Sequence, residues 1–207
     1  MARFKSSTFG KISGKHGTAV AVIRKDGLNI LREYRVASNP NTKYQKNQRG
    51  KFGFAVRELN CMRSIFTLTF DGQYGINRAV SLAMKTAITG EFPDFKLEYS
   101  KLIISNGSLN NSTQVSLEKL EGSSIQVNWS PDVFLEADQN DNVNLVFLNQ
   151  TSKTVVLKQN YSLQSAGSVD VELPVNWADK EIHCWMYFTS TDGTVFSTSQ
   201  YICRLLL

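Results

Sequence analysis

Short runs rich in β-branched and aromatic residues alternate with turn residues from Phe95 to the end of the chain. Runs of this length separated by turns at this spacing are typical of a β-sandwich. The runs cover residues 96–105, 113–120, 123–129, 143–149, 153–159, 168–173, 181–190 and 195–206. The second half of the chain is therefore predicted to form an antiparallel, immunoglobulin-like β-sandwich over residues 95–207.

The last two runs have the clearest pairing signal. They are joined by Thr191-Asp192-Gly193-Thr194, which has the composition of a two-residue hairpin turn. Counting outward from this turn places Cys184 opposite Tyr201 and Ile182 opposite Cys203. The sequence thus predicts a definite register for the final hairpin.

Both faces of this predicted hairpin are apolar. One face carries Cys184, Met186, Phe188, Tyr201 and Cys203, and the other carries Trp185, Tyr187, Phe196 and Ile202. A sheet with one face in water alternates apolar and polar residues, so we expect both faces to be covered. One would meet the sandwich core and the other the helical segment or a second subunit. Trp185 and Tyr187 are therefore candidate interface aromatics.

The first part of the chain predicts a hairpin followed by helices. Residues 18–24 and 28–36 are strand-like runs joined at Lys25-Asp26-Gly27, which is a tight-turn signal. Thr42-Lys43-Tyr44-Gln45 has the residues of a capping box, so a helix should follow it.

Two apolar stripes at helical spacing lie beyond the capping box. The first contains Phe52, Ala55, Val56, Leu59, Met62 and Phe66, and the second contains Ile76, Ala79, Val80, Ala83, Met84, Ala87 and Ile88. Gly90 is placed as the glycine that ends the second helix. The predicted fold class is α+β, with a basic hairpin and two helices over residues 1–92 and the sandwich after them.

Charge is distributed unevenly along the chain. Residues 1–63 hold 14 Lys/Arg and 3 Asp/Glu, a net charge of +11, whereas residues 64–207 hold 9 Lys/Arg and 15 Asp/Glu, a net charge of −6. Such an asymmetry indicates an acidic partner for the first part, attraction between the two oppositely charged parts, or a solvated basic surface. The candidate binding residues are Lys11, Lys15, Arg24, Lys25, Arg32, Arg35, Lys43, Lys46, Arg49 and Arg57.

The residues that usually carry catalysis or metal binding are sparse. The two histidines, His16 and His183, lie far apart, and no Cys pair stands at zinc-ligand spacing. Residues 136–142 are rich in oxygen ligands but lack the glycine and terminal glutamate of an EF-hand loop, which favours a solvated loop. We expect no catalytic residue, no metal and no cofactor, and we expect the three cysteines to be free thiols.

The chain resembles a family of bacterial domains of unknown function, of similar length and of the type found in Bacteroidetes. The resemblance covers nearly the whole chain. Its most specific part is Asn39-Pro40-Asn41-Thr42 with Gln45 and Arg49, and later matches include Ile88-Thr89-Gly90 and Thr191-Asp192-Gly193. The resemblance implies no activity, because the family brings no established function.

Three functions agree with these features. The leading hypothesis is a non-enzymatic binding or assembly protein that contacts a protein partner, or a second copy of itself, through acidic surfaces. The first alternative is a nucleic-acid-binding protein that uses the basic residues on phosphates. The second is a carbohydrate-binding sandwich that uses Trp129, Trp177 or Trp185. The N-terminus has no apolar stretch of the signal-peptide kind and no run is long enough for a membrane helix, so we expect a cytoplasmic protein without membrane association.

Overall fold

The computed structural model describes residues 2–4, 10–36, 38–39, 41–71, 74–120, 122–130 and 140–207. These residues form two compact units, Met1–Thr42 and Lys43–Leu207. The sequence-based boundary lay at residues 92–95 instead. The structure divides earlier because the helices share a core with the sandwich, whereas the first strands form a sheet of their own.

The first unit is a four-stranded antiparallel sheet. Its strands are β1 (Ala2–Phe4), β2 (Gly14–His16), β3 (Ala19–Ile23) and β4 (Asn29–Glu33), in the spatial order β1-β4-β3-β2. The predicted hairpin is confirmed as β3–β4, with Val22 paired to Ile30. The buried Asn29 side chain donates to Gly10 O at 2.9 Å and accepts from Ile12 N at 3.3 Å. This clamp holds the glycine-rich lead-in against the sheet.

The second unit begins with the helical segment, as the capping-box residues predicted. It comprises α1 (Lys43–Leu59), η1 (Asn60–Met62), α2 (Arg63–Phe66), η2 (Thr67–Asp71) and α3 (Gly75–Thr86). Within the first predicted stripe, Ala55, Leu59, Met62 and Phe66 are buried. Phe52 and Val56 are 52% and 38% exposed, so their assignment to the buried stripe was wrong. The reason is that the body of the unit covers mainly the C-terminal half of α1.

The end of α3 also differs from the sequence interpretation. The helix stops at Thr86, and Ile88 and Gly90 lie in β5 (Ile88–Glu91), which pairs with β6 (Asp94–Leu97). Gly90 has φ +91°, and a Cβ there would overlap the carbonyl oxygen of Asp94. Glycine is therefore required by a tight hairpin rather than by a helix end.

The sandwich consists of two antiparallel sheets. Sheet β11-β8-β7 contains β7 (Val115–Lys119), β8 (Ser124–Trp129) and β11 (Ser168–Glu172). Sheet β10-β9-β12-β13 contains β9 (Asn142–Asn149), β10 (Thr154–Leu163), β12 (Glu181–Thr189) and β13 (Gln200–Leu206). The chain changes sheet after β8, β10 and β11, as in immunoglobulin-like sandwiches. The predicted α+β class with an immunoglobulin-like sandwich is confirmed.

One predicted strand is mostly absent. Of the run 96–105, only its first residues belong to β6, and the chain then forms η4 (Tyr99–Lys101). Beyond η4, Ile104 N donates to the Ser199 side-chain oxygen at 2.9 Å and Ser199 N donates to Ser105 O at 3.0 Å. This stretch connects the helices to the sandwich. The Ser199 side chain accepts a backbone hydrogen bond there that a neighbouring strand would otherwise accept.

The predicted register of the final hairpin was wrong beyond the turn. Thr189 bridges Phe196 as the turn geometry requires, but Cys184 then pairs with Cys203 and Trp185 with Tyr201. An irregularity between Cys184 and Trp185 shifts the register by one residue. A bulge of this kind moves the following side chains to the opposite face. Tyr201 lies on the turn side of this irregularity, and it pairs with Trp185 instead of with Cys184 because the register has already shifted by one residue between the Thr189–Phe196 bridge and the Met186–Gln200 pair.

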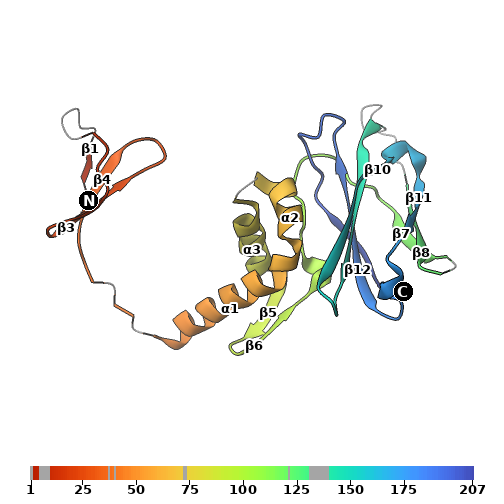
Figure 1. Cartoon of the computed structure of the whole chain (residues 1–207), viewed down its shortest axis with the longest axis horizontal. Coiled ribbons are helices and arrows are strands. Elements are labelled where there is room, and N and C mark those ends of the chain that lie inside the picture. The colour runs from red at the N-terminus through yellow and green to blue at the C-terminus, as the bar shows by residue number, and fades with distance from the viewer. Residues whose placement is uncertain are drawn as a thin grey trace. The chain divides into compact units, whose positions relative to one another are not determined.

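The expectation that both faces of β12 are covered is confirmed. Trp185 and Tyr187 belong to a core cluster with Leu59 and Phe66 of the helical segment, whereas Met186 and Phe188 face the second sheet. Figure 1 shows the resulting three layers of this unit, with the helices against the β12 sheet and the β7–β8–β11 sheet on its other side. The helices therefore supply the cover that the apolar outer face of this sheet requires.

Two glycines of the helical segment should respond in opposite ways to alanine. A Cβ at Gly53, within α1, meets nothing within 4 Å, so Gly53→Ala should raise the free energy of unfolding by about 0.5–1 kcal/mol. A Cβ at Gly75 would overlap the carbonyl oxygen of Phe66, so Gly75→Ala should lower it by about 1–3 kcal/mol. Urea denaturation measures both signs, and a loss of stability in both variants would contradict the packing described here.

The two aromatics on the outer face of β12 provide a second contrast. Trp185 is 0% exposed and its indole N–H donates to Leu102 O at 3.2 Å, so Trp185→Ala should lower the free energy of unfolding by about 3–5 kcal/mol. The buried Tyr187 hydroxyl has no hydrogen-bond partner among the described residues, so Tyr187→Phe should be neutral or stabilising by up to about 1 kcal/mol. A loss below about 0.5 kcal/mol for Trp185→Ala would show that the outer face is open to water.

Candidate functional site

The structure divides the ten predicted binding residues between the two units. Lys11, Lys15, Arg24, Lys25, Arg32 and Arg35 belong to the first unit, and Lys43, Lys46, Arg49 and Arg57 belong to α1. All ten are exposed. They form two separate basic surfaces, one on each unit, and each surface has to be judged on its own contacts.

The basic residues of the first unit are partly engaged in local contacts. Arg24 pairs with Asp26 at 3.5 Å, and Arg35 pairs with Glu33 at 3.0 Å. Lys15 and Arg32 both face Val20 across neighbouring strands and so share one side of the sheet, where the Lys15 ammonium lies 4.0 Å from the Tyr34 ring centre. These exposed pairs contribute little to stability, and they neutralise part of the positive charge.

Helix α1 is more strongly basic, and Arg57 at its C-terminal end pairs with Glu58 at 3.5 Å. Its only acidic residue, Glu58, accepts from the Lys153 ammonium at 2.8 Å and is thereby neutralised. Lys51 belongs to the same surface, although the sequence interpretation did not include it. Two aromatic side chains are exposed among these cations, Tyr44 at 77% and Phe52 at 52%. The α1 surface thus combines positive charge with exposed apolar area.

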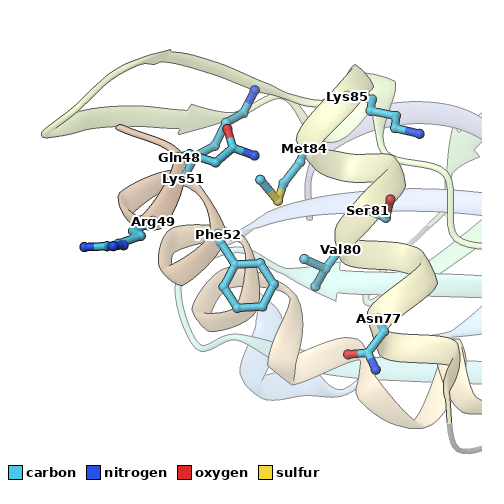
Figure 2. A pocket seen from close by; sticks show the side chains of 9 residues that line it. All are labelled: Gln48, Arg49, Lys51, Phe52, Asn77, Val80, Ser81, Met84 and Lys85. Carbon is cyan, nitrogen blue, oxygen red and sulfur yellow. The ribbon is translucent and has the colours of Figure 1, made fainter. Parts of the chain in front are cut away.

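A groove runs between α1 and α3 beside these residues. It encloses about 580 Å³, and we refer to it as the α1–α3 groove. Figure 2 shows Phe52 of α1 facing Val80 and Met84 of α3 across it. The lining residues are Gln48, Arg49, Lys51 and Phe52 from α1, and Asn77, Val80, Ser81, Met84 and Lys85 from α3. Its volume lies within the range of about 300–1,000 Å³ that is usual for ligand-binding sites.

The groove has an apolar floor and a positive rim. Val80 is buried and Met84 half-buried, while Arg49, Lys51 and Lys85 supply three positive charges. None of the described residues that line the groove is acidic. On α3 the lining residues recur at positions 77, 80, 81, 84 and 85, which is one face of a helix. The arrangement can hold an apolar group while attracting negative charge around it.

Sequence reasoning found only part of this groove. Arg49 was among the candidate residues, but Phe52, Val80 and Met84 were assigned to buried stripes. Lys85 lies in the part of the chain that is acidic on average, so the charge asymmetry concealed it. The usable signal was the spacing of Asn77, Ser81 and Lys85 along α3, which marks a polar edge beside the apolar stripe.

The aromatics proposed for other roles are buried. Trp185 and Tyr187 lie inside the core under the helices, so the interface that they form is the one between the β12 sheet and the helical segment of the same unit. Trp129 and Trp177 lie in the sandwich core, and the Trp129 indole N–H donates to Gln164 O at 2.7 Å. A carbohydrate platform needs exposed aromatic faces, and the three tryptophans do not provide one here.

The other groups with catalytic potential have structural surroundings. His183 stacks on Tyr99 with ring centres 4.1 Å apart, and its ring nitrogens lie 2.9 Å from Tyr201 Oη and 3.1 Å from Gln150 Oε1. Burial, together with the nearby charge of Arg204, lowers the pKa of His183 to about 4. A histidine with this pKa stays neutral and is a weak base at neutral pH.

The cysteines are free thiols in this structure. Burial raises the pKa of Cys61, Cys184 and Cys203, so all three stay protonated at neutral pH, which makes them weak nucleophiles. Among the described residues, no three His, Cys, Asp or Glu side chains are grouped so as to hold a metal ion. Of the acidic stretch considered for calcium, residues 136–142, residues 136–139 lie outside the described part of the chain.

His183 should make stability depend on pH. Its pKa is about 6.5 in the unfolded chain and about 4 in the fold, so the unfolded state binds more protons between these values. The free energy of unfolding should therefore fall as the pH drops from 6.5 to 4, by at most about 1.4 kcal/mol per pH unit from this residue. Urea denaturation at several pH values in this range gives the slope of the unfolding free energy against pH. The slope should be smaller in His183→Gln, in which the carboxylates still titrate but the contribution of His183 is lost. Equal slopes would exclude the effect.

Comparisons with known proteins add a family but no activity. No curated protein matches the chain. Three similar solved structures each match 49% of this chain. The fibronectin type III domain of human contactin 1 has 12% identity, is covered over 75% of its length and has a TM-score of 0.31. The FN1–FN3 domains of chicken CNTN1 have 15% identity, 33% coverage and a TM-score of 0.35, and the fibronectin type III domain of the human collagen α-1(XX) chain has 11% identity, 86% coverage and a TM-score of 0.32. These likenesses are too distant to bear on function.

None of the helices in the described part of the chain is both long and apolar enough to cross a bilayer. A family model for a family of unknown function, DUF6266, matches residues 11–203. The match spans both units and nearly the full sequence, in agreement with the resemblance noted above. The chain therefore belongs to the DUF6266 family.

Proposed function

We propose that this protein is a non-enzymatic binding or assembly protein that docks an acidic surface of a protein partner along helix α1. The observation that carries the proposal is the basic α1–α3 groove, in which cations lie beside an apolar floor that is exposed at Phe52 and no described lining residue is acidic. Purely electrostatic attraction would need only the charges. The exposed Phe52 ring indicates a partner that also offers apolar area.

The sequence of α1 supports this function because several of its charged residues lower the stability of the helix. Its first turn has no acidic residue, and Lys43 and Lys46 stand near the helix N-terminus, where the helix dipole disfavours positive charge. Lys43, Lys46 and Arg49 follow one another at i, i+3 spacing, and like charges at this spacing cost a helix about 0.2–0.5 kcal/mol per pair. A negatively charged partner would relieve both effects.

The neutral His183 and the protonated thiols support a role without catalysis. Nucleic acid is the competing partner, because phosphates would also satisfy the cations of α1. The two partners differ in what the Phe52 floor contributes. A phosphate backbone gains nothing from an apolar groove between two helices, whereas a protein side chain does.

Binding to a random-sequence DNA duplex and to an acidic peptide, each between 50 and 200 mM salt, tests the proposed function. We expect the peptide to bind more tightly than the duplex at 150 mM salt. The variant with Lys43, Lys46, Arg49 and Arg57 changed to Glu should lose peptide binding by at least about 10-fold. A variant with Lys119 and Lys180, exposed on the sandwich, changed to Glu carries half of this charge change and tests whether charge reversal away from α1 also weakens binding.

Submicromolar duplex binding that weakens about 1,000-fold across this salt range would replace the protein partner by nucleic acid. Binding of neither probe would show that the basic surface is only solvated. Sedimentation at several concentrations distinguishes docking of another protein from docking of a second copy, since only the latter makes the apparent mass rise with concentration.

A further inference from the structure

The α1–α3 groove has the features of a seat for a helix. Its walls are two packed helices, and its apolar lining follows one face of α3 from Asn77 to Lys85. Ser81, a small residue, lies midway along this face. Small residues let another backbone approach closely. Helix α3 is held in place, because Ala79 and Ala83 on the side of α3 away from the groove belong to the core.

The apolar part of the groove is short and has cations beside it, which matches the surface of an amphipathic helix. Phe52, Val80 and Met84 form one apolar site, and the cations lie beside it on both helices, with Arg49 and Lys51 on α1 and Lys85 on α3 (Figure 2). An amphipathic helix presents an apolar stripe with polar residues on its two flanks. Acidic flanks would bring carboxylates toward both cationic walls while the stripe covers the floor.

Other acidic occupants fit less well. An extended acidic segment has no edge to pair with here, because both walls are helices whose backbone hydrogen bonds are internal. The exposed side of sheet β11-β8-β7 in a second copy is acidic, since Glu118 and Asp170 both face Gln126 across neighbouring strands. That row is polar, so it would leave the Phe52 floor uncovered. The floor and the rim together require an element that is apolar on one side and acidic on the other.

From these features we propose that the occupant of the α1–α3 groove is an acidic amphipathic helix of a partner protein, which completes a three-helix layer with α1 and α3. This inference rests on the proposed function and adds the form of the partner element to it. An apolar side chain of the helix, such as Leu, lies between Phe52, Val80 and Met84. Its carboxylates pair with Arg49, Lys51 and Lys85 at the rim.

The experiment measures fluorescence anisotropy of two labelled peptides of about 18 residues with the full-length protein. Both contain the same Leu, Glu and Ala residues. In one, the Leu residues recur at i, i+3, i+4 and i+7, and in the other their order is scrambled so that no apolar face forms. The amphipathic peptide should bind at least about 10-fold more tightly, since only it presents an anchor and acidic flanks together.

Two variants connect the binding to the groove. Phe52→Ser removes the most exposed part of the floor, and it should keep the fold because the ring is already half in water. It should weaken the amphipathic peptide by roughly 10-fold or more and leave the scrambled peptide unchanged. Lys51→Glu with Lys85→Glu should weaken the amphipathic peptide at least as strongly, whereas Lys119→Glu with Lys180→Glu should leave its binding within about twofold.

The outcomes separate this inference from the proposed function. Equal binding of both peptides would overturn the helical occupant and leave an acidic partner in place. Failure of both peptides to bind would overturn the two proposals together. Self-association that disappears in Phe52→Ser would assign the groove to a second copy of this chain, and it would overturn the inference of a separate partner.

Discussion

The burial of strand β12 on both faces is the constraint on which the rest of the second unit depends. A strand that is buried on both faces needs apolar side chains on both. Ile182, Cys184, Met186 and Phe188 supply them on one face of β12, and Trp185 and Tyr187 on the other. One face is covered by the second sheet and the other by the helical segment. The helices cannot leave without exposing Trp185 and Tyr187 to water, so the sandwich and the helices form one cooperative body.

Polar contacts at the border of this core fix where the helices sit. The Lys153 ammonium, in the turn between β9 and β10, reaches both Glu58 Oε2 at 2.8 Å and Tyr99 Oη at 2.9 Å. Tyr99 in turn stacks on His183 of β12. These contacts join the C-terminal end of α1 to the sandwich and leave Lys43, Lys46 and Phe52 of the same helix at the surface. The position of the groove is thus a consequence of how the sheet is covered.

Local patterns in the sequence predicted most elements because each depends on neighbouring residues. The β3–β4 hairpin, the start of α1 and seven sandwich strands follow from turn residues and periodicity. The failures occurred where distant contacts decide. The bulge after Cys184 is invisible in the alternation of residues, and Gly90 serves a hairpin whose second strand begins only at Asp94. Phe52 had a suitable spacing for burial, but no segment of the unit covers it.

The candidate site shows the same limit in its charges. A sum over residues 1–63 finds a basic region, yet the fold divides that region between two units and adds Lys85 from a segment that is acidic on average. The residues of α1 that disfavour an isolated helix remain informative. Cations near a helix N-terminus, glycines within the helix and an exposed Phe52 each lower the stability of the isolated unit. Natural proteins tolerate such conflicts mainly where function requires them. The cations and the exposed Phe52 ring stand on different sides of the same helix, so under the proposed function a partner that lies along α1 would offset both costs by supplying negative charge and apolar area.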